Sequence, residues 1–366
     1  MGVLYRRVLK PILFRFSPDT VHEFFIAVGE TAGRFAISRW LLGLFYNYSA
    51  GGGPASGGRD ISKTVDGIYY RTPILLSAGF DPDGQLTQIL PSLSFGGEEI
   101  GSVTAHSCIG NERPHFKRLI RNKSIVVYKG LRNMGVGALI NKLSHTPRIP
   151  DFVLGISIAR TNEKAASVDA EAGIRDYVAS FKKLTAAGIG DYYAINISCP
   201  NAHFGEAFTN PKLLAKLLPR LREIPCTKPV YVKMPINVSW EQFIELADIA
   251  DTNGIQGLII GNVTKEYTDL EHPEDAPKEF RGGFSGAPTF ARSNRLISQT
   301  RARYGDRFTI IGVGGILSPD DAMEKFAAGA DLIALVSGMI FNGPGLIKEI
   351  CKRFAIGHVI KQSIDF

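Results

Sequence analysis

The sequence IIGVGGI (310–316), which runs directly into LSPDDAMEKFAAGAD (317–331), decides the fold. A β-branched run ends in paired glycines, and a helix with a Ser cap starts a few residues later. Such a turn brings backbone N–H groups and the positive end of a helix dipole together, which suits a phosphate group. VSGMIFNGPG (336–345) repeats this glycine-containing turn after the next predicted strand. Barrels often bind phosphate after strands seven and eight, so the repeat predicts a phosphate site there. The alternative is that these glycines serve only tight turns.

Six more apolar runs precede these two, and each has the length of a strand buried on both faces, as parallel sheets require. The eight runs are 72–79, 98–104, 152–159, 192–198, 229–235, 257–262, 308–315 and 332–338. Helix-like segments lie between them, among them 210–223, 239–254 and 318–330. We therefore predict an α/β fold, a (β/α)8 TIM barrel. An open doubly wound sheet is the alternative, although no GxGxxG opens the first strand–helix turn.

Three regions of the chain differ in composition. Residues 1–48 are rich in Phe, Leu, Ile and Arg, and we expect an N-terminal amphipathic helical extension there. Residues 49–60 (SAGGGPASGGRD) are rich in Gly, Ser and Pro and are predicted to be a linker or loop. Residues 61–366 form the predicted barrel.

Charge and cysteine content narrow the class of protein. Lys plus Arg number 42 against 35 Asp plus Glu, a net charge of +7. That excess does not indicate nucleic-acid binding, but it suits contact with anionic phospholipid or anionic small molecules. The four cysteines show no CxxC spacing and follow no signal peptide, so we expect a reduced compartment and no metal site. No apolar run reaches the ~18 residues of a membrane-spanning helix.

The fourth strand ends in NISCPN (196–201), which places two carboxamides and a thiol at the face where barrel active sites lie. Cys199 could act as a general base if its neighbours stabilise the thiolate. Pro200 and the stretch 202–208 resemble a loop able to cover the site. The alternative is that Cys199 is a buried, inert residue.

Three further positions carry candidate ligand groups. Lys233 is a lone lysine in the apolar fifth strand, and it could stabilise negative charge that develops on a bound ligand. The alternative is an ion pair across the barrel. Asn262 ends the sixth strand and could present its amide to the same ligand. Ser285 and Gly286 form another Gly-rich turn, which is weak evidence by itself.

With these residues assembled, the chain resembles dihydroorotate dehydrogenases, in particular the membrane-associated, quinone-using class, from about residue 5 to residue 354. The motifs that carry the resemblance are SAGFDPDG (77–84), EIGSVT (99–104), NISCPN (196–201), VKMP (232–235), GGFSG (282–286), IIGVGGI (310–316) and FNGPGLIKEI (341–350).

The resemblance implies a role for individual residues. It implies flavin mononucleotide (FMN) contacts at Ala78, Gly79, Ser102, Asn196, Lys233, Ser285, Gly286, Gly314, Gly315, Ser337 and Gly338. It implies substrate contacts at Asn196, Asn201 and Asn262, and it places Cys199 at the position of the catalytic base, with Lys233 also catalytic. That base is usually Ser in the quinone-using class and Cys in the soluble class, so the N-terminal segment and the base indicate different classes.

The substrate region departs from the family pattern. Pro82 stands where the motif AAGxDKxG has Lys, and Val127 stands where NRxGFN has an Asn expected to touch substrate. Neither side chain can bond a carboxylate or an imide. Either Lys129 or Arg132 is a candidate to restore the missing positive charge from the neighbouring loop.

Two smaller departures follow the third and sixth strands. A family Asn is Ser157 here, and a family Thr is Val263. Each unpaired polar group of a substrate would cost on the order of 1–3 kcal/mol. The flavin site therefore matches the family, whereas the substrate site is altered.

The N-terminal extension is predicted to hold two amphipathic helices. Thr20 to Glu23 has the spacing of a capping box and would open the first, and residues 34–46 would form the second. The expected apolar surface consists of Phe24, Phe25, Trp40, Leu41, Leu44 and Phe45, rimmed by Arg6, Arg7, Lys10, Arg15, Arg34 and Arg39. Such a pair lies in the bilayer interface. The alternative is a hairpin packed on the barrel or on a second subunit.

The resemblance implies that this hairpin attaches the enzyme to a membrane and leads quinone to the flavin. The chain would then be peripheral (monotopic), at the cytoplasmic face of a membrane or at the mitochondrial inner membrane in a eukaryote.

The function expected first is FMN-dependent oxidation of dihydroorotate to orotate, a step of pyrimidine biosynthesis, with quinone as electron acceptor. One alternative is a divergent FMN oxidoreductase that acts on another dihydropyrimidine-like or enone substrate, as Pro82 and Val127 suggest. A second is a non-enzymatic flavin-binding or membrane-surface module. A metal-dependent barrel hydrolase is disfavoured, because the strand ends lack a His/Asp/Glu cluster.

Overall fold

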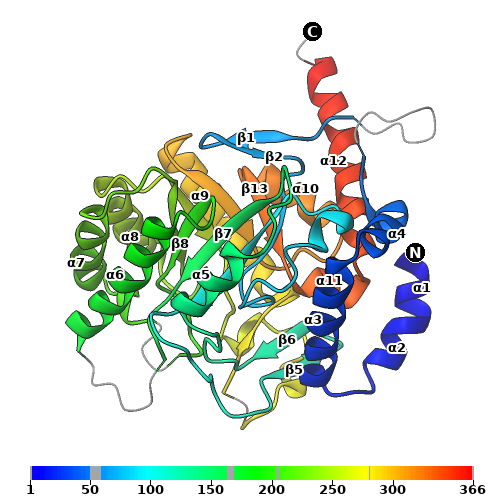
Figure 1. The fold of residues 1–366 in the computed structure, drawn as a ribbon, viewed down its shortest axis with the longest axis horizontal. Coiled ribbons are helices and arrows are strands. Elements are labelled where there is room, and N and C mark those ends of the chain that lie inside the picture. Colours follow the sequence, from blue (N-terminus) through cyan, green and yellow to red (C-terminus); the bar gives the residue numbers. More distant parts are fainter. Residues whose placement is uncertain (1, 50–58, 163–168, 203–205, 280, 365–366) are drawn as a thin grey trace.

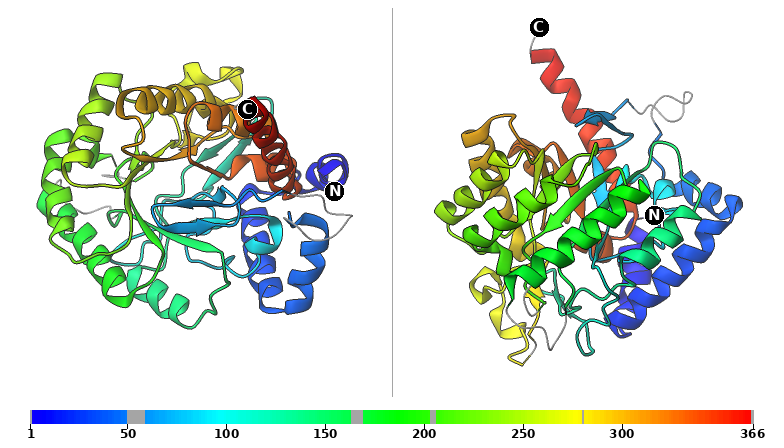
Figure 2. Two further views of the ribbon diagram at one scale, coloured as in Figure 1. Left: turned by 90° about the horizontal axis from the view of Figure 1, so that it is seen from above. Right: turned by 60° about the vertical axis from the view of Figure 1, so that its left-hand side comes forward.

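The computed structural model describes residues 2–49, 59–162, 169–202, 206–279 and 281–364. In this part of the chain, a barrel of strands is ringed by helices, and the N-terminal helices stand against one side of it (Figures 1 and 2). Most of the predicted linker (residues 50–58) and the centre of the predicted loop (residues 203–205) lie outside the described residues. The predicted boundaries of the three regions therefore stay a prediction.

Eight parallel strands close into a barrel, which confirms the predicted fold over the open sheet. They are β3 (Ile74–Leu76), β4 (Gly97–Val103), β7 (Val153–Ile158), β8 (Tyr192–Asn196), β9 (Val230–Met234), β10 (Gly257–Ile260), β12 (Thr309–Val313) and β13 (Leu332–Leu335). The last strand returns to pair with the first, with Ile333 opposite Ile74. The strands start within two residues of the predicted runs, because burial of both faces leaves an apolar run in the sequence.

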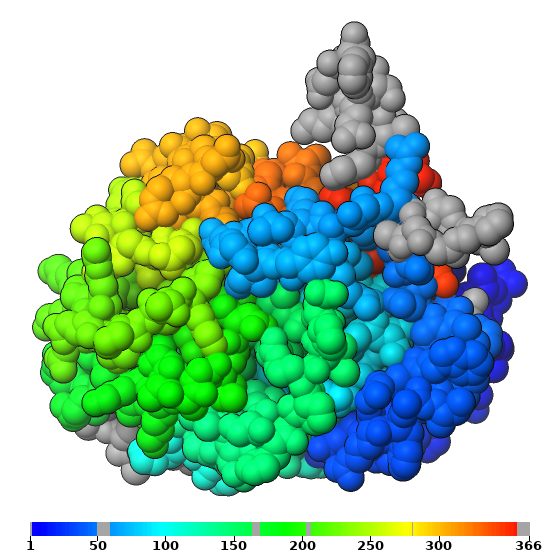
Figure 3. Space-filling model, turned by 45° about the horizontal axis from the view of Figure 1, so that its top comes forward, coloured from blue at the N-terminus to red at the C-terminus, as the bar shows by residue number. Residues whose placement is uncertain are grey.

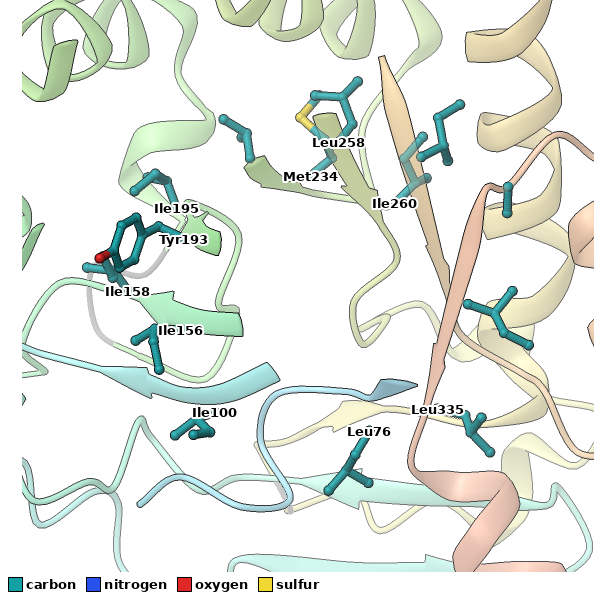
Figure 4. Close-up of a cluster of buried hydrophobic side chains, with 14 of the residues drawn as sticks. Leu76, Ile100, Ile156, Ile158, Tyr193, Ile195, Met234, Leu258, Ile260 and Leu335 are labelled. Carbon is teal, nitrogen blue, oxygen red and sulfur yellow. The ribbon is translucent and has the colours of Figure 1, made fainter. Parts of the chain in front are cut away.

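Alternate side chains of the strands pack in two separate cores, as the two-residue period of a strand dictates. Leu75, Ala194 and Ile259 belong to a cluster that fills the barrel. Their neighbours Leu76 and Ile195 belong to the larger cluster between the strands and the helices, part of which is shown in Figure 4. Both faces of each strand are thus packed in a hydrophobic core. The carboxyl ends of the strands are where a ligand-binding site can form.

The outer helices follow the strands. They are α5 (Val136–Ser144), α6 (Ala170–Ala187), α7 (Pro211–Arg222), α8 (Trp240–Thr252), α9 (Phe290–Tyr304), α10 (Pro319–Ala327), α11 (Ser337–Asn342) and α12 (Gly345–Ile364), with 3-10 turns η3 (Ala207–Thr209), η4 (Tyr267–Asp269), η5 (Pro273–Asp275) and η6 (Ala287–Thr289). The predicted serine caps are present: the Ser239 hydroxyl accepts from the N–H of Gln242 and the Ser318 hydroxyl from that of Asp321.

The first strand differs from this pattern. The segment between β3 and β4, which is described throughout, contains only the 3-10 turn η2 (Leu90–Leu93) and no α-helix. Helix α4 (Ala36–Tyr46) packs on η2 instead. Helix α3 (Pro18–Arg34) meets the segment before η2 through Gly29 and Gly33, where a Cβ would collide with Leu86 and Gln88. The N-terminal helices therefore cover the part of the barrel that has no outer helix of its own.

Two β-hairpins outside the barrel were not predicted. Strands β1 (Lys63–Val65) and β2 (Ile68–Tyr70) form one, and Tyr70 packs into the core inside the barrel. Strands β5 (Phe116–Leu119), β6 (Ser124–Val127) and β11 (Gly283–Phe284) form a three-stranded sheet near the other end (Figure 1). The first had a sequence signal, because Asp66–Gly67 is a typical hairpin turn.

The N-terminal extension is helical, as predicted, but its details differ. It begins with α1 (Gly2–Leu4), the π-helix η1 (Tyr5–Leu9) and α2 (Lys10–Leu13), before α3 and α4. The capping box predicted at Thr20 is wrong: α3 begins two residues earlier, at Pro18. Proline is suited to the first position of a helix, because its fixed φ is already helical and it has no N–H to leave unpaired. Glu23 instead pairs with Arg113 on a loop of the barrel.

The extension combines an exposed apolar surface with anchors to the barrel. All six predicted apolar side chains are exposed, among them Trp40 at 58% and Phe24 at 56%. Figure 3 shows the N-terminal helices in blue, forming one edge of the molecule. On the barrel side, the Tyr5 hydroxyl donates a hydrogen bond of 2.7 Å to the Ile340 carbonyl in α11. The same tyrosine ring lies where a Cβ on Gly343 would be.

Candidate active site

A cavity of about 550 Å³ lies at the carboxyl ends of the barrel strands and continues between the barrel and the N-terminal helices. Its size falls in the range of ~300–1,000 Å³ that is usual for small-molecule sites. Every residue assigned from the sequence to flavin, substrate or catalysis lines it: Ala78, Gly79, Ser102, Asn196, Cys199, Asn201, Lys233, Asn262, Ser285, Gly286, Gly314, Gly315, Ser337 and Gly338. The barrel topology therefore brings them together as expected.

One wall of the cavity consists mainly of backbone. Gly314 and Gly315 have φ values of +105° and +72°, which favour glycine. A Cβ on Gly315 would lie 2.4 Å from the Cβ of Phe290, so only glycine fits this turn. The hydroxyls of Ser285 and Ser337 lie 2.9 Å apart at the start of α11. This cradle of N–H groups and hydroxyls fits the phosphate of FMN.

Behind the cavity, a layer of polar side chains crosses the barrel. The Asn196 amide donates to the Ser102 hydroxyl (2.8 Å), which in turn shares a hydrogen bond with Ser157 (2.7 Å). Lys233 pairs with Glu99 across the barrel at 3.1 Å, and both side chains are buried. The ion pair that the sequence left open is thus present, and Lys233 also lines the cavity. A buried cation and an oriented carboxamide could both contact the edge of a flavin ring.

Cys199 is half-buried on the loop after β8, and its thiol is not activated by the surrounding charges. Burial raises the pKa of Cys199, and this outweighs the opposing effects of the Asn201 N–H and of Lys233. The sequence analysis required a stabilised thiolate for Cys199 to act as a general base. In this structure the thiolate forms only at alkaline pH. The side-chain oxygen of the neighbouring Asn201 is buried and accepts no hydrogen bond from the described residues. A substrate N–H could satisfy it.

Hydrogen bonds hold this loop in place from two sides. The amide of Asn262 donates to the carbonyl and hydroxyl of Ser198, at 2.7 and 2.9 Å. The amide of Asn111 donates to the Asn201 carbonyl at 2.8 Å. Sequence reasoning missed Asn111, because it lies far from the loop in the chain and belongs to no motif. It is a positioning residue for the wall that carries the thiol.

Three of the four departures from the family pattern also line the cavity, and the fourth, Ser157, is buried behind it. Pro82, Val127 and Val263 present apolar surface there. Lys129 is 8% exposed, and its ammonium group donates to the Gly79 carbonyl at 3.3 Å. The other candidate for the missing charge, Arg132, is about half exposed and lies 3.5 Å from the Glu23 carboxylate. Of the two cations, only Lys129 is buried at the site.

The helical end of the cavity is apolar. Its walls include Leu9, Leu13, Phe14, Val21, Phe25, Val28 and Leu42. His22 lies between this end and the strand ends, where its ring contacts the Phe80 carbonyl at 2.8 Å and burial lowers its pKa to about 4. Arg118 contacts the Phe14 ring and donates to the Phe16 carbonyl. A largely apolar passage, with Arg118 on its wall, therefore joins the N-terminal helices to the strand ends.

The described part of the chain contains neither a metal-binding cluster nor a membrane-spanning helix. No cluster of three or more His, Cys, Asp or Glu side chains there could hold a metal ion. None of the described helices combines the length and the apolar character needed to span a membrane.

Comparison with known proteins assigns the chain to a family. Residues 60–356 match the family described as Dihydroorotate dehydrogenase. The dihydroorotate dehydrogenase (quinone) of Salinispora arenicola is 33% identical over 94% of this chain and 97% of its own length. That of Thermosynechococcus vestitus is 32% identical over 95% of each chain.

A solved structure has the same fold. DHODH from Eimeria tenella in complex with ferulenol superposes with a TM-score of 0.74 over 94% of this chain and 92% of its own, at 22% identity. The fold, the strand-end cavity and the sequence relatives agree. The chain belongs to the dihydroorotate dehydrogenase family, in the quinone class that the two bacterial relatives represent.

Proposed function

We propose that this chain oxidises dihydroorotate to orotate with the aid of bound FMN and passes the electrons to a quinone at a membrane surface. One observation carries the proposal: a single cavity joins the glycine turns, the thiol and the carboxamides at the strand ends to an apolar passage under the N-terminal helices. A polar reductant and an apolar oxidant can thus reach one cofactor from two directions.

The glycine turns and the polar layer would hold FMN. The proposed contacts are Ala78, Gly79, Ser102, Asn196, Lys233, Ser285, Gly286, Gly314, Gly315, Ser337 and Gly338. When bound, FMN supplies the two-electron chemistry: it accepts hydride from the substrate and is reoxidised by quinone. Lys233 provides positive charge where the reduced ring becomes negative, and Glu99 holds its ammonium group in place.

The substrate would lie between the flavin site and the loop after β8. Asn196, Asn201 and Asn262 offer carboxamides to its ring, and the oxygen of Asn201, which accepts no hydrogen bond from the described residues, can accept one of its N–H groups. The Cys199 thiolate takes the proton from the carbon alpha to a carbonyl, while hydride leaves from the adjacent carbon. Because burial raises the pKa of this thiol, the step should be faster at alkaline pH.

The N-terminal helices would dock on a lipid surface. Their exposed residues include Phe24, Trp40 and Leu44, and such a surface rimmed with basic side chains suits the bilayer interface. The full chain should co-sediment with vesicles of phosphatidylcholine and an anionic lipid, and a Trp40→Asp, Leu44→Asp variant should stay in the supernatant. Sedimentation of both proteins to the same extent would refute the docking.

An anaerobic experiment tests the reaction. We expect dihydroorotate to bleach the 450 nm absorbance of the oxidised holoenzyme, and a ubiquinone or menaquinone analogue to restore it. A flavin that stays oxidised with dihydroorotate would exclude the proposal.

The second candidate is a divergent FMN oxidoreductase that acts on an uncharged dihydropyrimidine or an enone. The apolar surface of Pro82, Val127 and Val263 in the cavity favours it. Under that alternative, dihydrouracil bleaches the oxidised flavin in the same assay, or a cyclic enone reoxidises flavin that has first been reduced with dithionite. Dihydroorotate does not bleach the oxidised flavin.

A further inference from the structure

Lys129 is a buried cation that lines the cavity and has no counter-ion among the described residues. It follows β6, and its side chain is 8% exposed. Its ammonium group has three donors; it donates to the Gly79 carbonyl at 3.3 Å and lies 5.9 Å from the centre of the Phe116 ring, and neither partner carries a negative charge. No carboxylate of the described residues lies within ion-pair distance of it. Since a buried lysine is seldom left unpaired, the arrangement calls for an anion from outside the chain.

The acidic side chains around Lys129 are bound elsewhere. Asp81 accepts from the backbone N–H groups of Gln85 and Leu86, at 2.9 and 2.6 Å. Asp83 accepts from the N–H of Met134 at 2.9 Å. These carboxylates favour the charged form of Lys129 only by longer-range electrostatic attraction.

The remaining charged neighbours of Lys129 lie on α3 and on its own loop. Asp19 lies 3.3 Å from the His115 ring. Burial lowers the pKa of His22 to about 4, so this ring is neutral at physiological pH. Arg132 disfavours the charged form of Lys129 and points to Glu23. Burial, the largest effect, lowers the pKa of Lys129 to about 8, which leaves it mostly charged at pH 7 and open to further stabilisation by an anion.

Other cations that line the cavity do not meet this description. Lys233 already has Glu99, and Arg118 lies beside Phe14 at the helical end. The loop of Lys129 is also joined to the thiol loop: Asn111 donates its backbone N–H to the Lys129 carbonyl and its side-chain amide to the Asn201 carbonyl. The unpaired cation thus belongs to the substrate side of the cavity.

We propose that Lys129 binds the carboxylate of the substrate and so makes the site selective for an anionic dihydropyrimidine over an uncharged one. This inference rests on the proposed function and names its specificity-determining residue. The apolar surface of Pro82 and Val127 then lines the space around the ring, while a single cation supplies the selectivity for charge.

Four forms of the holoenzyme test this role: wild type, Lys129→Met, Lys129→Arg and Arg132→Met. Arg132→Met is the matched control. It removes an exposed cation of the same loop, whose side chain points to Glu23. Titration calorimetry with orotate measures binding without turnover, and orotate methyl ester provides the same ring without the charge. The KM for quinone and the FMN content are recorded for each protein.

Loss of a charge-assisted hydrogen bond in a buried site should weaken orotate binding by Lys129→Met about 10- to 100-fold. Ester binding and the KM for quinone should change less than about threefold, as expected for a loss of charge alone. Lys129→Arg should regain most of the affinity, and Arg132→Met should bind orotate like the wild type.

Several results would overturn the assignment: orotate binding by Lys129→Met within threefold of wild type, equal weakening of acid and ester, or a change confined to the KM for quinone. If Lys129→Met does not retain FMN, Lys129→Gln is measured in its place against the same criteria. A wild-type protein that neither binds orotate nor is reduced by dihydroorotate would instead refute the proposed function, which separates the two failures.

Discussion

The cavity mouth has two walls that are built in different ways. The glycine wall, formed by Gly314, Gly315, Ser337 and Gly338, consists of backbone from two consecutive strand–helix turns. The side-chain wall, formed by Cys199, Asn201, Lys129 and Val127, is assembled from loops far apart in the chain. The first is fixed by conformations that only particular local sequences allow. The second depends on which side chains the fold happens to place opposite one another, so it can change while the cofactor site is kept.

The largest expected effect comes from adding one methyl group to the glycine wall. In Gly315→Ala the new Cβ would lie 2.4 Å from Phe290 at a φ of +72°, so the turn must move. Strain on the order of 3 kcal/mol predicts at least about 100-fold weaker FMN binding. The control Gly188→Ala has a similar φ of +65° but open space around the Cβ, and it should stay yellow. Equal FMN content in both purified variants would show that this wall does not hold the cofactor.

The side-chain wall should behave in the opposite way, with loss of chemistry but not of cofactor. Cys199→Ala should retain FMN and slow its anaerobic reduction by dihydroorotate by about 10²–10⁴-fold, the usual contribution of a general base. Cys199→Ser keeps a hydroxyl at the same position and should lie between the two. Stopped-flow absorbance at 450 nm measures the rate, and a Cys199→Ala protein reduced as fast as wild type would disprove the role.

The pH dependence should separate two residues of the side-chain wall. The pKa of Cys199 lies above its ordinary value of about 9, so below that value the rate of flavin reduction should rise about tenfold per pH unit. The pKa of Lys129 is about 8, so the fraction of charged lysine falls above pH 8 and the KM for dihydroorotate should rise there. Cys199→Ala should abolish the first slope and Lys129→Met the second. A maximal rate that is flat from pH 7 to 9 would contradict the thiol as base.

The smallest effect concerns the hydrogen bond that positions the thiol loop. Asn111→Ala removes the donor to the Asn201 carbonyl, worth on the order of 1 kcal/mol, and should raise the KM for dihydroorotate about 3- to 10-fold without loss of FMN. Asn122→Ala, which removes two hydrogen bonds to the backbone of His272 outside the cavity (3.0 and 2.8 Å), is the control. Equal KM values for the two variants would show that Asn111 does not position this wall.

The same contrast explains what could be predicted from the sequence. Strands buried on both faces leave continuous apolar runs, and glycine turns leave paired glycines, so the barrel and the glycine wall were readable from the sequence. The position of Lys129 opposite Gly79 depends on a hairpin, β5–β6, that had no strong turn signal, and it brings together residues 50 positions apart. The direction of the Cys199 pKa shift could not be predicted either, because it is set by burial rather than by its neighbours in the chain.

The start of α3 shows the same limit on a smaller scale. The spacing of Thr20 and Glu23 fits a capping box, but Pro18 starts the helix and Glu23 reaches a cation of the barrel instead. A local motif specifies a helix start only if its side chains have no better partner in the folded protein. Arg113, which is 90 residues away, is such a partner.

The bond from Tyr5 to Ile340 bears on how the protein can be shortened. The first helices expose apolar surface, and removing them is an obvious way to obtain a protein that stays in solution without detergent. However, the Tyr5 ring packs beside Gly343 and its hydroxyl holds α11, the helix whose first residue is Ser337 of the glycine wall. Truncation there would thus release α11, whose first residue belongs to the glycine wall, while removing the exposed apolar surface. Polar substitutions on the exposed face of α4 would give the same solubility and leave that attachment intact.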